Sequence, residues 1–178
     1  MSDPLPQLIR SAAQGDERAF AALHARYKKW VHAILLARLP PSDAEDQVQE
    51  VFLLAWKKLS QLDDTAGFGS WLGAIARHRA IECYRRRRPT EPLASSWPDL
   101  RSASSADLAD AHRALAAIQS LPEAYRETLV MRLCEGMSGP EIADVTGLEH
   151  GSVRINLHRG MKLLREKLGI EERVAAGE

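Results

Sequence analysis

The sequence predicts an all-α protein made of two small helical domains joined by a flexible linker. Apolar residues recur with helical spacing along most of the chain, and the alternation typical of strands is nearly absent. Segment 89–108 breaks this spacing with prolines and serines, a composition typical of extended connectors. We therefore predict a first domain over 1–88, a linker over 89–108, a second domain over 109–170 and a tail over 171–178.

Length and composition fit this division. The chain has 178 residues, 45% of them apolar and 27% charged, which indicates a globular protein with room for two small domains. The net charge is zero, so charge alone argues neither for nor against a nucleic-acid partner. Positive charge is nevertheless concentrated in the first part, where 14 Lys and Arg stand against 10 Asp and Glu up to Arg88.

Several classes of function lack their residues. Cys83 and Cys134 are far apart and form no CxxC pair, and the histidines show no metal-ligand spacing, so we expect no metal and no cofactor. No nucleophile or carboxylate cluster suggests an enzyme. The N-terminus has no signal-peptide pattern and no apolar run is long enough for a bilayer, so we expect a cytoplasmic protein without membrane insertion.

Helices are expected in order at 5–14, 16–38, 43–60, 67–88, 107–119, 123–135, 138–146 and 150–168. Ser42 is the predicted N-cap of the third helix, because an acidic first turn follows it. The core face of that helix is formed by Val48, Phe52, Ala55, Trp56 and Leu59. Leu53 and Leu54 lie away from this face beside carboxylates and amides. From the spacing alone, they either form a protein-binding patch or pack on a neighbouring helix.

The fourth helix begins apolar and ends basic. Its early face holds Phe68, Trp71, Leu72 and Ile75, and arginines with an interleaved Tyr84 follow. Such a pattern fits phosphate contacts plus base stacking on an opened strand, although a run of four arginines is also typical of a solvated helix end. His78 and Glu82, four residues apart, are interpreted as a structural polar pair.

The last two helices have helix-turn-helix spacing. Ser138 and Glu141 form a capping-box pattern, and Gly147 stands where a left-handed turn residue is needed. The core stripe of the last helix comprises Val153, Leu157, Met161, Leu164 and Leu168. Its opposite side is small, basic and amide-bearing, as a helix that enters the DNA major groove requires.

These motifs together resemble a known family. The string Asp43 to Phe52 is similar to region 2.2 of sigma factors (D-x-E-D-x-x-Q-E-x-F), and Phe68 to Arg77 resembles regions 2.3 and 2.4. The stretches Leu121 to Arg126 and Glu141 to Arg159 resemble region 4 of the extracytoplasmic-function (ECF, group IV) sigma factors of the sigma-70 family. The chain departs from the family pattern at Ile155-Asn156, where Ser-Arg is usual, and at Gly160, where Ala is usual.

The resemblance implies a non-enzymatic transcription initiation factor that binds core RNA polymerase, at the clamp of the largest subunit and the flap of the second-largest. It also implies promoter DNA as a partner and an anti-sigma factor as regulator. The implied polymerase-binding residues are Asp43, Asp46, Gln47, Gln49, Glu50 and Leu53. Those for the downstream promoter element are Phe68, Trp71, Arg77, Arg79, Tyr84, Arg85, Arg86, Arg87 and Arg88. Those for the upstream element are Ser152, Arg154, Ile155, Asn156, Arg159 and Lys162.

One alternative remains open from the helix-turn-helix alone. A dimeric helix-turn-helix regulator that does not bind core polymerase would use the same recognition helix. It would need a dimerisation helix or a ligand pocket, and the sequence suggests neither. It would also leave the string from Asp43 to Phe52 without a role.

Overall fold

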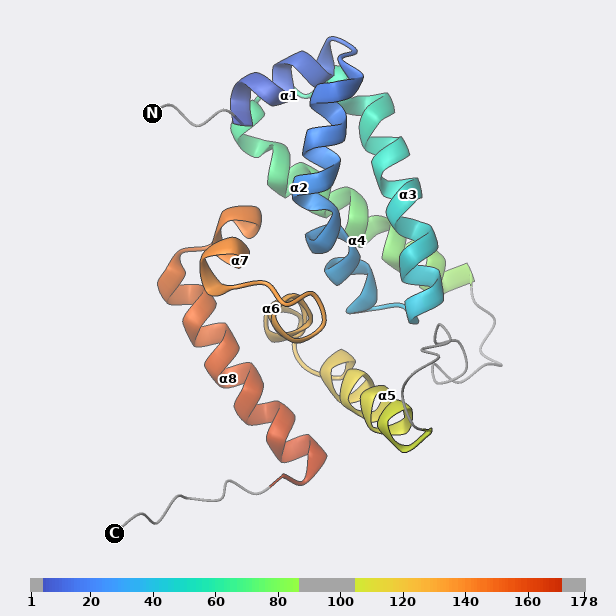
Figure 1. Ribbon diagram of the computed structural model, residues 1–178, viewed down its shortest axis with the longest axis vertical. Coiled ribbons are helices and arrows are strands. Elements are labelled where there is room, and N and C mark those ends of the chain that lie inside the picture. The colour runs from blue at the N-terminus through green and yellow to red at the C-terminus, as the bar shows by residue number, and fades with distance from the viewer. Residues whose placement is uncertain (1–4, 87–104, 171–178) are drawn as a thin grey trace.

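The computed structural model describes residues 5–86 and 105–170, and in these ranges the chain is helical with no strand (Figure 1). The first range contains α1 (Leu5–Ala13), α2 (Glu17–Leu36), α3 (Pro41–Lys58), two short 3₁₀ turns η1 (Leu59–Gln61) and η2 (Thr65–Gly67), and α4 (Phe68–Arg86). The second contains α5 (Ser105–Gln119), α6 (Glu123–Leu133), α7 (Gly139–Thr146) and α8 (His150–Leu168). The predicted all-α class is therefore confirmed.

Helix α2 is the centre of the N-terminal half. It packs on α1, α3 and α4, and its buried side chains include Leu23, Trp30 and Ile34. Against them lie Val48 and Phe52 of α3, from the core face that the sequence predicts for this helix. The opposite face of α3 therefore lies on the outside of the bundle (Figure 1).

In the C-terminal half, α6 packs across α8, and α5 and α7 also pack against α8 (Figure 1). Val153 and Leu164 of the predicted core stripe are buried, and Leu157, Met161 and Leu168 pack partly buried against the core. Gly160 is buried where α8 meets α6. A Cβ there would lie 3.1 Å from Leu129 Cδ1, so the missing side chain lets the two helices approach closely.

The two halves pack against each other. Buried apolar residues of both halves form one cluster, and α6 and α7 lie against α2 and α4 (Figure 1). Gln119 at the end of α5 donates hydrogen bonds to the carbonyls of Leu36 and Leu39, at 2.9 and 3.1 Å. Leu36 is the last residue of α2, so its carbonyl has no partner within the helix, and Leu39 lies three residues beyond it. The second half therefore completes the C-terminal end of a helix in the first.

The helix boundaries show which local signals were predicted correctly. The capping box of Ser138 and Glu141 is formed, and Gly147 has φ 71°, so both predictions are confirmed. The prediction of Ser42 as an N-cap is wrong, because α3 begins at Pro41 with Pro40 as its N-cap. Proline fits the first helical position, where its fixed φ is suitable and its missing N–H needs no partner.

Other outcomes concern the chain as a whole. Helix α5 begins at Ser105, inside the segment predicted as linker, and most of that segment and the predicted tail lie outside the described residues.

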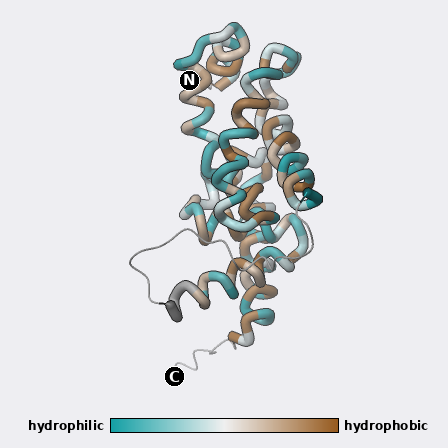
Figure 2. The backbone as a smooth tube through the Cα atoms, turned by 90° about the vertical axis from the view of Figure 1, so that its right-hand side faces the viewer, coloured by the Kyte–Doolittle hydropathy of each residue, from teal (hydrophilic) through white to brown (hydrophobic). Residues whose placement is uncertain are grey.

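Hydrophobic and hydrophilic residues alternate along the helices (Figure 2). Among the described residues, no helix combines the length and apolarity that crossing a bilayer would require.

Candidate functional site

The outer face of α3 carries the first candidate surface. We call Asp46, Gln49, Glu50 and Leu53 the α3 patch. All four are exposed, Leu53 at 52%. Leu53 therefore does not pack on a neighbouring helix, and the alternative that the sequence left open for this leucine is excluded in this structure. The patch combines two carboxylates, an amide and an uncovered leucine, the mixed character of protein-binding surfaces.

Asp43 and Gln47, from the same predicted set, face α4 and are half-buried. The Gln47 Oε1 accepts a hydrogen bond of 2.9 Å from Arg79 Nη2. The Asp43 Oδ2 lies 3.9 Å from the Cys83 Sγ, which donates to it. In this structure these two side chains connect α3 to α4. Of the residues predicted to bind polymerase, only those of the α3 patch are exposed to a partner.

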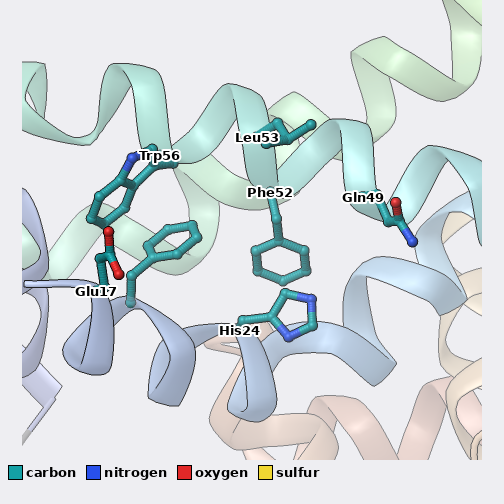
Figure 3. A pocket seen from close by; sticks show the side chains of 7 residues that line it. Glu17, His24, Gln49, Phe52, Leu53 and Trp56 are labelled. Atoms are coloured by element: carbon teal, nitrogen blue, oxygen red, sulfur yellow. The ribbon is translucent and has the colours of Figure 1, made fainter.

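An apolar hollow adjoins the α3 patch. It has a volume of about 440 Å³ between α2 and α3, and Gln49 and Leu53 of the patch form part of its lining (Figure 3). The rings of His24 and Phe52 lie 4.3 Å apart between centroids in this hollow. Burial, and then the charge of Lys28, lowers the pKa of His24, which favours the neutral imidazole.

The start of α4 corrects one prediction. Phe68 is 1% exposed, and its ring packs against Tyr27 of α2 at 5.2 Å between centroids. Trp71 is half-buried and packs beside it at 5.8 Å. The prediction that Phe68 contacts promoter DNA does not fit this structure, because the ring fills the core of the N-terminal bundle.

The arginines of α4 separate into two groups. Arg77 and Arg79 are bound within the protein, Arg79 by Glu82 at 3.1 Å and by Gln47. Arg85 and Arg86 are exposed beside Tyr84, which is 59% exposed. Arg87 and Arg88 lie outside the described residues. The exposed end of α4 is thus basic and aromatic, as the sequence predicted.

His78 and Glu82 approach each other to 3.9 Å on the exposed side of α4. This geometry agrees with the interpretation as a polar pair. In the described ranges, no group of three or more His, Cys, Asp or Glu side chains could hold a metal ion.

Helix α8 presents the second surface, on the side opposite its buried stripe. Exposed there are Ser152, Arg154, Ile155, Arg159 and Lys162. Asn156 is half-buried at the margin. Ile155 is 48% exposed, so the outward isoleucine that the helical spacing predicts is present.

Comparison with known proteins shows to which family the chain belongs. The family profile described as Sigma-70 region 2 matches residues 23–90, and that described as Sigma-70, region 4 matches 111–164. The RNA polymerase sigma factor CarQ of Myxococcus xanthus is 33% identical over 161 residues, covering 87% of this chain and 92% of that protein. The chain belongs to the extracytoplasmic-function sigma factors of the sigma-70 family.

Further relatives agree with this assignment. A probable sigma factor, RfaY of Xanthomonas campestris, is 32% identical over 169 residues, but the chain spans only 42% of its length. The solved structure of CnrH in complex with the cytosolic domain of CnrY is 29% identical in sequence and superposes with a TM-score of 0.61. The match covers 95% of this chain and 99% of the CnrH chain. In the family's terms, α2 to α4 belong to region 2 of a non-enzymatic sigma factor, and most of α5 together with α6 to α8 belongs to region 4.

The sequence did not reveal the contacts between regions 2 and 4. Glu127 of α6 is only 7% exposed, and it accepts hydrogen bonds from Arg77 at 3.0 and 2.8 Å. Its Oε1 also lies 2.8 Å from Arg38 Nη2 of region 2. Glu123 pairs with Arg38 as well. Arg77, predicted as a DNA contact, is therefore engaged by region 4 in this structure.

Electrostatics at Glu127 follow from this geometry. Burial alone would raise the pKa of this carboxyl, but the hydrogen bonds and charge of Arg77, and then those of Arg38, outweigh burial and lower it. The hydrogen bond to Glu127 also raises the pKa of Arg77. The sequence signal for this site was a carboxylate two residues before the apolar run of Leu129 to Met131, because a carboxylate buried beside such a run requires an ionic partner.

Proposed function

We propose that this sigma factor binds core RNA polymerase through the α3 patch and directs it to promoters with α4 and α8. The exposure of the α3 patch supports the proposal most strongly. The opposite face of α3 is packed in the core, whereas the carboxylates, the amide and Leu53 of the α3 patch remain exposed. These residues stand at positions that resemble region 2.2 of the family. An exposed leucine among polar groups is expected to be covered by a partner. The clamp of the largest polymerase subunit is the partner that the family suggests.

The downstream promoter element would be bound by the exposed end of α4. Arg85 and Arg86 supply charge for backbone phosphates, and Tyr84 offers a ring for an unstacked base. Promoter opening then comes from binding energy, because extruding a base costs only a few kcal/mol. No bond is made or broken by the protein.

The upstream element would be read by α8 in the major groove. Arg154, Arg159 and Lys162 are exposed toward phosphates, and Ile155 lies between them. An isoleucine cannot hydrogen-bond to a base edge, but it can pack on a thymine methyl group, and Asn156 suits a contact to adenine. We therefore propose an upstream element that favours A·T pairs more than is usual for relatives with Ser-Arg at these positions.

Two further partners complete the proposal. Region 4 would contact the flap of the second-largest polymerase subunit while α8 holds DNA. An anti-sigma factor would hold the protein inactive in the cytoplasm. This is supported by the similar structures of CnrH bound to the cytosolic domain of CnrY and of RpoE bound to the anti-sigma factor NepR from Bartonella quintana.

The experiment is a binding assay with purified core polymerase on a sizing column, followed by promoter DNA binding with and without core. A sigma factor co-elutes with core at a ratio of one to one and binds promoters strongly only in the complex. A dimeric helix-turn-helix regulator would elute as a dimer, ignore core and bind a palindromic operator alone. The second result would refute the proposal.

A further inference from the structure

A second hollow lies where the C-terminal ends of α2, α4 and α5 meet the first turn of α6. It has a volume of about 410 Å³, within the size range of small-molecule sites. Among the described residues that line it, Arg38, Arg85 and Arg126 are basic and none is acidic. We call it the arginine hollow, and its lining has the charge of a site for an anion.

Arg126 is the arginine of this hollow with the fewest bonds for its burial. Its Nη1 donates a hydrogen bond of 3.2 Å to the carbonyl oxygen of Gln119. Among the described residues, no acceptor bonds its Nε, which is buried, or its Nη2. Burial, and then the charge of Arg38, lowers the pKa of Arg126. An anion beside this guanidinium group would offset both effects.

Positive charge is in excess around the hollow. Four side chains form ion pairs that balance one another: Arg38, Arg77, Glu123 and Glu127. Arg85 and Arg126 remain, and neither forms an ion pair within the described part of the chain. Two unbalanced positive charges match a phosphate monoester, which carries about −1.5 to −2 at pH 7. The planar fork of arginine also fits the oxygens of a phosphate group.

The rest of the lining is apolar. Tyr84 and Ile81 of α4 face the hollow and are 59% and 44% exposed, so neither is covered by the protein. Ala37 and Ala80 also line it, and their small side chains leave its volume open. An exposed ring beside unpaired arginines suits a ligand that carries an aromatic ring, because any nucleobase can stack on a tyrosine. An inorganic anion would use none of this apolar surface.

We propose that the arginine hollow is a binding site for a small nucleotide, with its phosphate between Arg85 and Arg126 and its base against Tyr84. The site combines residues of α4 and α6, and it does not rest on the proposed binding of polymerase or promoter. Because Tyr84 and Arg85 are also proposed to contact the downstream element, a DNA strand is the competing occupant.

The test is calorimetric titration of the full-length protein with each common nucleoside 5′-monophosphate. We expect at least one of them to bind, with one molecule per chain. The matching nucleoside lacks the phosphate, and inorganic phosphate lacks the ring, so each should bind at least about ten-fold more weakly. A short single-stranded oligonucleotide without terminal phosphates is the probe for the competing occupant.

Variants then locate the bound nucleotide. Arg85→Ala should weaken binding about ten-fold, because it removes a charged partner of the phosphate, and it removes no core packing since Arg85 is exposed. Arg86→Ala is the matched control, because Arg86 is exposed but does not line the hollow, and it should keep the affinity. Tyr84→Phe keeps the ring and should bind as well, whereas Tyr84→Ser should bind more weakly.

A further variant tests the fork of Arg126. Arg126→Lys keeps the charge but loses the planar pair of donors, so it should also weaken binding. Circular dichroism verifies that this variant is helical, and Arg85→Ala keeps the test decisive if it is not.

Three results would overturn the site. The first is that no monophosphate binds, and the second is that Arg85→Ala and Arg86→Ala lose affinity equally, as they would for a ligand held by surface charge alone. The third is that the oligonucleotide binds more tightly than any monophosphate and is lost in the same variants, which would assign the hollow to the DNA-binding surface. Equal affinity for the nucleotide and for inorganic phosphate would overturn the role of Tyr84. Core polymerase enters none of these titrations, so failure of the site and failure of the proposed function are separate results.

Discussion

The indole ring of Trp30 in α2 lies directly over Gly73 in α4. A Cβ on Gly73 would be only 2.9 Å from Trp30 Cη2 and 3.1 Å from Cζ2. Trp30 is 2% exposed, so its ring has no solvent to move into. The glycine therefore sets the distance between the helix that centres region 2 and the helix that carries the proposed downstream DNA contacts.

Replacing Gly73 by alanine should destabilise the protein. Overpacking a filled core costs about 1–3 kcal/mol, and the better helix propensity of alanine returns about 1 kcal/mol. We expect a net loss of about 1 kcal/mol in the free energy of unfolding, measured with urea. Gly151→Ala is the matched control, because nothing lies within 4 Å of its Cβ position, and it should be neutral or stabilising. Equal stability of the two variants would contradict the contact.

Charge reversal in the α3 patch should weaken core polymerase binding without unfolding the protein. Asp46 and Glu50 are exposed, so Asp46→Lys with Glu50→Lys removes no core packing. Charges that become partly buried against a partner commonly contribute a few kcal/mol, so we expect a loss of at least ten-fold in affinity for core. Asp63→Lys, on the exposed segment before α4, is the control. Unchanged core binding by the double variant would remove the α3 patch from the interface.

Ile155→Ser should relax the preference for A·T pairs in the upstream element. Each lost thymine contact is expected to cost about 1 kcal/mol. Arg159→Ala should weaken binding without altering the sequence chosen, because a phosphate contact carries no base information. The measurement is selection from a randomised promoter pool by each holoenzyme. Identical selected sequences for the unaltered protein and Ile155→Ser would show that Ile155 does not read DNA.

Acid should remove the contribution of Glu127 to stability. Because its folded pKa is lowered below the ordinary 4.5, the contribution is complete above that value and is lost as the pH falls through the lowered pKa. The difference in free energy of unfolding between the unaltered protein and Glu127→Gln should therefore shrink below about pH 4.5. A difference independent of pH would contradict the ion pair. The other charged or titratable groups of this interface are Arg26, Lys29, His32, Arg38, Arg77, Glu123, Arg126, Glu135 and Asp144.

What the sequence predicted well was local. The helix-turn-helix follows from the capping box at Ser138, the left-handed Gly147 and the apolar stripe through Val153, all of which act within a few turns of chain. The outward position of Ile155 and Leu53 likewise follows from the helical period. The family motifs then supplied the functional interpretation of these surfaces.

What the sequence did not predict depends on contacts between distant residues. Phe68 was placed with the DNA contacts because the string from Phe68 to Arg77 resembles regions 2.3 and 2.4. Only the packing of Tyr27 against its ring shows that Phe68 belongs to the core. Arg77 and Glu127 are 50 residues apart, on either side of the connector. No periodicity or motif links them, so their pairing emerges only from the packing of region 4 on region 2.

Run-off transcription with purified core polymerase is the most direct test of the central claim that this chain is a promoter-specificity subunit. A pool of promoters with randomised elements is transcribed with core alone, with core plus the protein, and with core plus Asp46→Lys, Glu50→Lys. We predict discrete transcripts from a subset of promoters only when the unaltered protein is present, with strongly reduced transcripts for the variant. The same transcripts with core alone, or none on any promoter with the protein, would contradict the assignment.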